Sequence, residues 1–147
     1  MTLPARSLMR SATVMPRPFL RLAFVLFTSG FISLIILADS GHAGGLWSFI
    51  ASIPGGDKLG HLVLVGTLSV LLNLLLENRR APFPCNRIML GSLILIIATT
   101  LEEASQAWIP HRNFDLFDAL ANIVGALCGE GLLRMLPRRH TQSSATT

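Results

Sequence analysis

The chain concentrates chemically active side chains in one interval, EEASQAWIPHRNFDLFDALAN, which runs from residue 102 to residue 122. Half of its eight acidic residues fall there, together with an Arg and several amide side chains. Carboxylates transfer protons or bind cations, and a guanidinium holds a phosphate or carboxylate through two parallel hydrogen bonds. The interval is therefore either a solvated polar loop or the working part of the protein.

A second polar group, DKLGH, begins at Asp57. It supplies a carboxylate, the ammonium of Lys58 and the imidazole of His61. Because His61 follows Asp57 by four residues, a helix would place both side chains on one face, with His61 about one turn further along. The spacing predicts a helix that begins with this polar face.

Polar and small residues continue at helical spacing after the first interval. Asp115, Asp118, Asn122, Gly125 and Gly129 are three or four residues apart and form one stripe on a helix. Charged groups are costly when they face lipid, and two glycines four residues apart let another helix approach closely. We therefore expect the stripe to face protein, with Gly125 and Gly129 as helix-packing residues.

The rest of the sequence indicates what solvent surrounds these residues. The chain has 147 residues, of which 51% are hydrophobic and 14% charged, and its mean hydropathy is +0.58. A small water-soluble domain has too much surface to bury so many apolar side chains, which favours a bilayer as the solvent. Strand-like alternation is absent. Four apolar segments approach the ~20 helical residues that cross ~30 Å of hydrocarbon: Phe19–Ala38, Leu59–Leu76, Ile88–Ala107 and Phe117–Leu136.

The predicted fold is all-α, with four transmembrane helices in one membrane domain at residues 18–137. Residues 1–17 are expected to form a disordered basic arm, and residues 138–147 a disordered tail. Ten of the twelve Lys and Arg residues fall on one side of these helices, and only Lys58 and Arg112 fall on the other. The positive-inside rule then places both termini in the cytoplasm and the protein in the cytoplasmic, or inner, membrane as a multi-pass protein.

A cleavable signal peptide is an alternative explanation of the first apolar segment. The sequence GHA before Gly44 offers small residues at a cleavage site. The apolar run is longer than a usual signal core, however, and four crossings return the basic C-terminus to the cytoplasm. The excess of positive charge, +4 overall, is expected to interact with anionic membrane lipid. A nucleic-acid partner is not predicted, since no recognisable binding module is present.

Counting helical rise from the basic side brings three segments to a common depth. His61, Asn122 and either Glu102 or Glu103 would lie about one turn inside the outer boundary. Gln106 shares a helix face with these glutamates, and Arg112 lies in the turn that follows. The predicted binding residues are Asp57, Lys58, His61, Glu103, Gln106, Arg112, Asp115, Asp118 and Asn122, and Glu103 and His61 are the candidate catalytic residues.

The two polar groups resemble the VanZ-like family of small bacterial membrane proteins. The resemblance rests on DKLGH at residues 57–61 and on EASQAWIPHRNFDLFDALANIVGALCG at residues 103–129, with order and spacing intact over about half of the chain. Family members commonly carry aromatic residues after the His, where this chain has Leu62 and Val65 and no Tyr at all. The resemblance implies an association with low-level resistance to glycopeptide antibiotics such as teicoplanin.

Three functions are compatible with these residues. The first is an outward-facing pocket for an anionic ligand, such as a lipid head group, a lipid-linked cell-wall precursor or a glycopeptide, held by Arg112 and Lys58. The second is an outer-leaflet hydrolase or transferase that acts on a lipid-linked substrate, with Glu103 or His61 as acid or base. The third is a scaffold, in which His61 pairs with Glu103 and Arg112 with Asp118.

Other chemistry has less support in the sequence. No cofactor is predicted, and one His with carboxylates on separate helices has no metal-binding spacing, although His61, Asp57 and Glu103 are conceivable ligands. A transport path is not expected, because the inner half offers few polar groups. Glu130, in that half, is expected to pair with Arg134 four residues on.

Overall fold

The computed structural model describes residues 16–40, 45, 49, 52–109 and 114–136. Over these residues the chain forms four α-helices and one short 3-10 helix, and no strand. The helices are α1 (Arg17–Asp39), α3 (Gly56–Leu75), α4 (Leu90–Ser105), η1 (Gln106–Trp108) and α5 (Leu116–Met135). The prediction of an all-α fold is confirmed. The predicted disordered arm and tail, and the suggested cleavage site at residues 41–43, lie almost entirely outside the described residues.

Three of these helices, α1, α3 and α5, are long and apolar enough to cross a membrane. Their bounds agree with the predicted segments to within three residues. The helix α4 differs, because it has 16 residues where a longer segment was predicted. The backbone at Met89 is extended, so α4 begins only at the next residue. The last residues of the predicted segment form part of the 3-10 helix η1 instead of α-helix. A fourth membrane crossing therefore stays a prediction.

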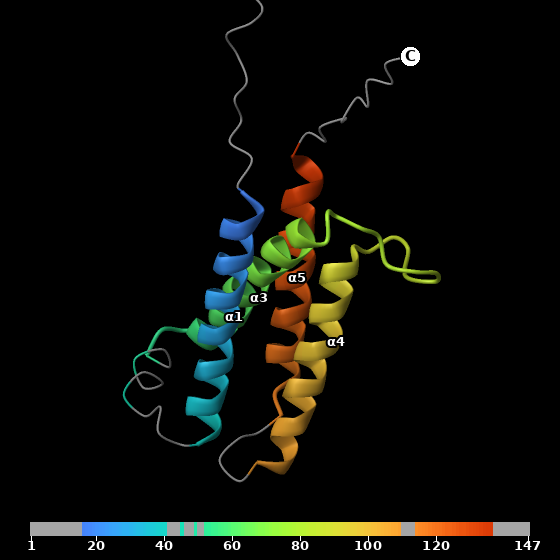
Figure 1. Ribbon diagram of the computed structural model, residues 1–147. Helices are drawn as coiled ribbons and strands as arrows, with labels where there is room; N and C mark the ends of the chain where they lie inside the picture. The colour runs from blue at the N-terminus through green and yellow to red at the C-terminus, as the bar shows by residue number, and fades with distance from the viewer. Residues whose placement is uncertain (1–15, 41–44, 46–48, 50–51, 110–113, 137–147) are drawn as a thin grey trace, which may run out of the picture.

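The helices run up and down, so that their charged ends sort into two groups (Figure 1). The start of α1, the end of α3, the start of α4 and the end of α5 lie at one end, which we call the basic end. It carries Arg17, Arg79, Arg80, Arg87 and Arg134. Arg17 forms an ion pair with Glu77, which links the start of α1 to the end of α3. Arg134 donates to the backbone carbonyl of Arg87, which links the end of α5 to the start of α4. The opposite end, the acidic end, carries Asp57, Glu102, Glu103, Asp115 and Asp118.

The helices α3 and α5 pack against each other more extensively than any other pair. Glycines allow this, because a Cβ built on Gly125 would lie 2.5 Å from the carbonyl oxygen of Leu62. A Cβ on Gly129 would collide with the carbonyl oxygen of Gly66. The glycine stripe of α5 thus lies directly against the backbone of α3.

Apolar side chains line a small core and also much of the outer surface. Val65, Leu68, Leu95 and Ala126 form the core, against which α1 packs Phe24, Phe27 and Phe31. Large apolar residues such as Val25, Leu26, Ile97, Leu101 and Leu120 are exposed. An apolar exterior around a small core is the distribution expected where lipid replaces water as the solvent.

Candidate functional site

Three helix ends meet at the acidic end and position the polar side chains. Gly55 precedes α3 with a φ of 69°, a left-handed conformation that suits glycine, so that Asp57 and Lys58 fall in the first turn. Asp115 caps α5, because its side chain accepts a hydrogen bond from the backbone N–H of Phe117 at 2.8 Å. The end of α4 brings Glu103 to the same place.

The ammonium of Lys58 is the centre of the more exposed half of this site. Its Nζ donates to Asp57 at 2.6 Å and to Asp115 and Asp118 at 3.0 Å each. Lys58 on α3 therefore joins two carboxylates of the α5 N-terminal region. The hydrogen bond that Lys58 donates is the main reason that the pKa of Asp115 lies below its usual value of 3.8.

His61 lies one turn deeper and contacts two residues of α5. Its Nδ1 is 3.0 Å from Oδ1 of Asn122, and its Nε2 is 3.6 Å from Oδ2 of Asp118. Since an amide oxygen only accepts hydrogen bonds, this assignment makes Nδ1 the protonated nitrogen of the neutral imidazole. Nε2 then faces the Asp118 carboxylate. Asn122 is 1% exposed, and its Nδ2 is buried without a hydrogen-bond partner among the described residues.

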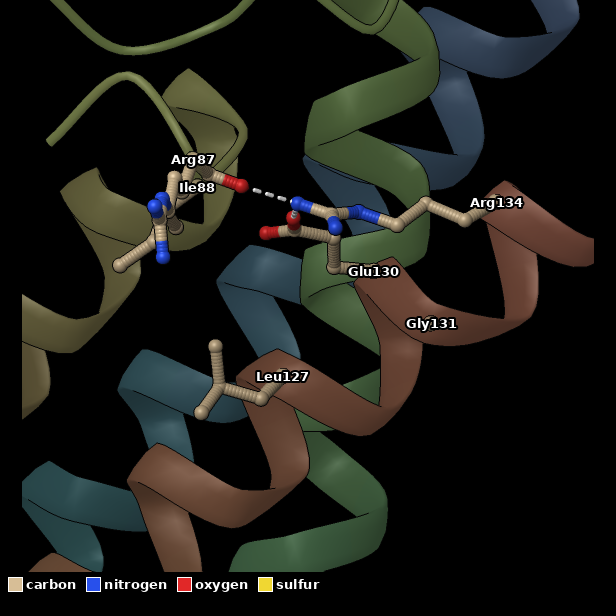
Figure 2. Close-up of a pocket in the computed structure, with 6 residues that line it drawn as sticks. All are labelled: Arg87, Ile88, Leu127, Glu130, Gly131 and Arg134. Atoms are coloured by element: carbon tan, nitrogen blue, oxygen red, sulfur yellow. Dashed lines mark hydrogen bonds and ion pairs between the residues drawn. The ribbon is translucent and has the colours of Figure 1, made fainter.

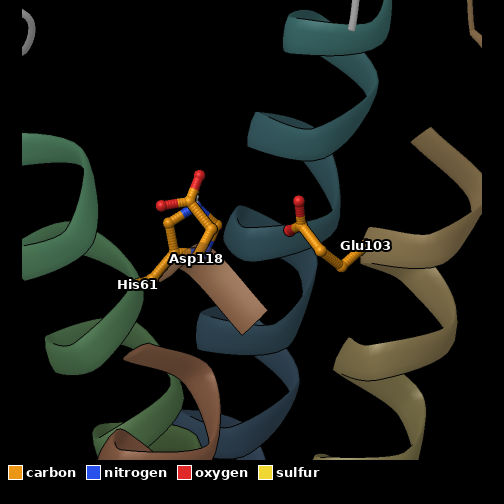
Figure 3. Close-up of side chains that lie close together, drawn as sticks. All are labelled: His61, Glu103 and Asp118. Carbon is orange, nitrogen blue, oxygen red and sulfur yellow. Dashed lines mark ion pairs between the residues drawn. The ribbon is translucent and has the colours of Figure 1, made fainter. Parts of the chain in front are cut away.

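Glu103 is the buried acid of the site, with no exposed surface. Its Oε1 accepts from the backbone N–H of Asp115 at 3.0 Å, and its Oε2 accepts from Nε2 of Gln106 at 3.4 Å. Gln106 also donates to Glu102 at 2.9 Å. Glu103 thus connects the end of α4 to the start of α5. Figure 3 shows it facing His61 and Asp118, and potential metal-ligand atoms of these three residues lie within 4.8 Å of one another.

The structure brings together eight of the nine predicted binding residues, from Asp57 on α3 to Asn122 on α5. The ninth, Arg112, lies outside the described residues. The scaffold alternative paired His61 with Glu103, but the His61 imidazole lies against Asp118 instead, with Nε2 3.6 Å from Oδ2. The Glu103 carboxylate accepts the Asp115 backbone N–H and the Gln106 amide instead, while Asp118 lies where α5 faces α3. The sequence predicted no metal site. Of the side chains that it considered as ligands, His61 and Glu103 lie together with Asp118 rather than with Asp57.

A second buried acid, Glu130, lies at the basic end (Figure 2). It is 3% exposed, pairs with Arg134 as expected, and accepts a hydrogen bond from the backbone N–H of Met89 at 3.0 Å. A hollow of about 260 Å³ beside it is lined by Arg87, Ile88, Leu127, Glu130, Gly131 and Arg134. The link to Met89 joins α5 to the start of α4, and the only sequence signal for it was an isolated carboxylate in an apolar helix.

Between the two ends, a small buried polar group lies where α3, α4 and α5 meet. Asn73 donates to Ser92 at 2.9 Å and to Ser69 at 3.3 Å, and Ser69 donates to the carbonyl of Ala126 at 2.7 Å. The buried Val65 lies between this group and His61 on α3. The sequence indicated only that the inner half offers few polar groups, and it did not reveal these partners.

The site and fold together describe a helical protein with membrane-length helices and a buried polar cluster at one end. Comparison with known protein families, with characterised proteins and with solved structures finds no match in any of the three. The resemblance to the VanZ-like family stays a prediction from the residues quoted above.

Proposed function

We propose that this protein is a VanZ-like protein of the bacterial inner membrane whose acidic end binds an anionic, lipid-linked ligand of the cell envelope. The observation that supports this proposal is the convergence of Lys58, His61, Glu103 and Asn122 from three helices, at the end of helices that are long and apolar enough to cross a membrane. Ionisable groups within membrane-spanning helices cost free energy and usually serve a function.

The proposed topology has four crossings with the basic end in the cytoplasm. The 16 residues of α4 rise about 24 Å, and η1 adds about 6 Å, so the two together match ~30 Å of hydrocarbon. Arg residues dominate the basic end, which the positive-inside rule assigns to the cytoplasm. The acidic end then opens to the outer leaflet, where lipid-linked envelope precursors and glycopeptides are found.

A groove on the side of the bundle supports a ligand with a hydrocarbon chain. It has a volume of about 230 Å³ and lies between α1, α3 and α4, with Phe24, Phe31, Leu68 and Leu95 among its lining residues. The carboxylate-bearing Glu102 also lines it and accepts a hydrogen bond from Gln106, which reaches Glu103. A chain in this groove would hold its head group beside the polar cluster.

Charge at the cluster determines how an anion would bind. The Lys58 ammonium is shared among three carboxylates, so a phosphate must compete with them for its hydrogen bonds. Arg112, predicted in the adjoining turn, supplies the second cation and a bidentate geometry that matches phosphate. The Asn122 amide N–H, which has no partner among residues 16–40, 52–109 and 114–136, offers a neutral hydrogen bond.

A hydrolase or transferase acting on the same ligand is the second candidate function. It is favoured by His61, whose Nδ1 is held by Asn122 while its Nε2 faces Asp118, and by the buried Glu103 nearby. A histidine with one nitrogen held by a hydrogen bond and the other directed into a site is suited to proton transfer. Glycopeptide resistance would follow from either function if the ligand is a cell-wall precursor or the drug.

Paired substitutions separate ligand binding from scaffolding. Glu103→Gln keeps an acceptor for the Asp115 N–H, and Arg112→Lys keeps a positive charge, so both variants should melt close to the wild type in detergent. Both should lose binding of lipid-linked precursor, and both should lose the change in teicoplanin susceptibility that the proposal predicts for overexpression of the wild type. Glu130→Gln, which neutralises the buried acid at the opposite end, is the matched control and should retain both.

Each result has a distinct meaning. Binding and susceptibility that persist in Glu103→Gln and Arg112→Lys would refute the proposal. A lower melting temperature in both variants, together with loss of binding and of the susceptibility change, would establish the scaffold instead. Product formation from the bound ligand by the wild type, absent in Glu103→Gln, would favour the hydrolase or transferase.

A further inference from the structure

The acidic end contains two adjacent sets of three potential cation ligands, which share Asp118. The first set is Asp57, Asp115 and Asp118, and the Lys58 ammonium lies among its carboxylates at 2.6 to 3.0 Å. The second set is His61, Glu103 and Asp118. Asp118 serves the first set through Oδ1, which accepts from Lys58, and faces the second through Oδ2. Among the described residues, Lys58 is bonded to the second set only through the shared Asp118, and no Lys or Arg side chain is bonded to Glu103 or His61.

We propose that His61, Glu103 and Asp118 bind a divalent transition-metal cation such as Zn²⁺. This inference does not rest on the proposed function, since it follows from the three side chains alone.

The hydrogen bond to Asn122 prepares His61 to act as a ligand. With Nδ1 donating to Oδ1 of Asn122, the lone pair of Nε2 faces Oδ2 of Asp118 at 3.6 Å. Two electron-pair donors in this arrangement repel each other unless a proton or a cation lies between them. Metal-binding histidines almost always donate their other ring N–H to an oxygen in this manner, which makes Asn122 a positioning residue for the imidazole.

Burial and charge favour a divalent ion. Glu103 has no exposed surface, and the side chains of Asp118 and His61 are 17% and 23% exposed. Buried charges must be paired or coordinate a metal. Two carboxylates and a neutral imidazole carry a charge of −2, which a divalent cation balances.

The ligand types select among divalent cations. Imidazole nitrogen suits Zn²⁺ and its neighbours, whereas Mg²⁺ and Ca²⁺ prefer oxygen ligands alone. Three protein ligands leave a fourth position of a tetrahedral zinc ion for water or for a ligand oxygen. Within the part of the chain that the structure describes, the buried Nδ2 of Asn122 has no hydrogen-bond partner. It lies on the amide that holds His61, so it is available to donate to that oxygen.

Metal content and melting temperature of the purified full-length protein test the proposal. After treatment with a chelator, the protein in detergent should take up one Zn²⁺ per chain and melt several degrees higher with Zn²⁺, but not with Mg²⁺. Co²⁺ in place of Zn²⁺ should give the visible absorption bands of a tetrahedral site. Glu103→Gln and His61→Gln should weaken Zn²⁺ binding by at least about a hundredfold, and Asn122→Ala by about 10- to 100-fold.

Glu130→Gln is the matched control, because it makes the same change on a buried acid at the opposite, basic end, and its Zn²⁺ affinity should equal that of the wild type. Equal affinity of Glu130→Gln and Glu103→Gln would overturn the proposal, since the ion would then bind groups elsewhere on the chain. Failure of the wild type to bind Zn²⁺ would also overturn it. Neither result would alter the ligand-binding test above.

Discussion

Gly129 of α5 lies directly against the backbone carbonyl of Gly66 on α3, so these two helices meet without an intervening side chain at this point. Gly125 makes the equivalent contact with Leu62 one turn earlier. In a bilayer, where apolar side chains gain little by leaving lipid, such close backbone packing is a principal source of helix association. The close packing of α3 and α5 therefore positions the site residues that these two helices carry at the acidic end.

Substitution of these glycines should weaken the bundle even when the new side chain is small. Gly125→Ala and Gly129→Ala force a methyl group against backbone atoms, which cannot rotate away, and should lower the free energy of unfolding by about 1–3 kcal/mol. Gly131→Ala is the matched control on the same helix, because a Cβ there meets nothing within 4 Å, and it should be neutral or slightly stabilising. Melting in detergent gives the comparison, and equal losses at all three positions would contradict the packing described.

The Asp115 carboxylate should confer a pH-dependent increment of stability. Its pKa is lowered by Lys58 from 3.8, so the increment is complete above that value and is lost as the pH falls through the lowered pKa. Asp115→Asn keeps the helix cap but removes the charge. The difference in melting temperature between the wild type and Asp115→Asn should be constant from about pH 5 to pH 7 and shrink below about pH 4. A difference that grows with acidity would show that the Lys58 contact does not stabilise the fold.

Glu130 should be required for the start of α4. Glu130→Ala leaves the Met89 N–H without its acceptor and removes the carboxylate paired with Arg134, and should cost about 1–3 kcal/mol of unfolding free energy. Glu130→Gln retains an acceptor and should cost less. Chemical denaturation of both variants in mixed micelles would measure the two losses, and the prediction fails if the Gln variant is the less stable.

The native cysteines allow the proposed orientation to be tested. Cys85 lies in the loop between α3 and α4 at the basic end, and Cys128 lies within α5. In a Cys128→Ala background, a membrane-impermeant maleimide should leave Cys85 unlabelled in intact cells and label it after permeabilisation. In a background without either native cysteine, Phe114→Cys, at an exposed position of the acidic end, should be labelled in intact cells. Labelling with the opposite pattern would show that the basic end, rather than the acidic end, faces the outside of the cell.

Much of this arrangement could be predicted from the sequence because it depends on local periodicity. The spacing of apolar residues located three helices to within three residues, and the three- and four-residue steps from Asp115 to Gly129 indicated one face of α5. The partners of charged groups could not be predicted in the same way. Lys58 and Asp118 are 60 residues apart, and which carboxylate receives the ammonium depends on how α3 and α5 cross.

The length of α4 illustrates the same limit. Its apolar residues begin at Ile88, but the chain there is held in a bridge between Arg80 and Met89, and Glu130 of α5 binds the Met89 N–H. Tertiary contacts of this kind determine where a helix begins, and they cannot be predicted from hydropathy alone.

The dependence of α3 on α5 also constrains how the protein is made. The ribosome synthesises α5 after α1, α3 and α4, so α3 enters the membrane while His61 and Ser69 still lack their partners on α5. Ser69 has its backbone acceptor, and His61 its amide and carboxylate partners, only once α5 has arrived. The insertion machinery must therefore retain α3, or shield its polar face, until the last of these helices leaves the ribosome. A nascent chain that stops before α5 would be a substrate for membrane quality control.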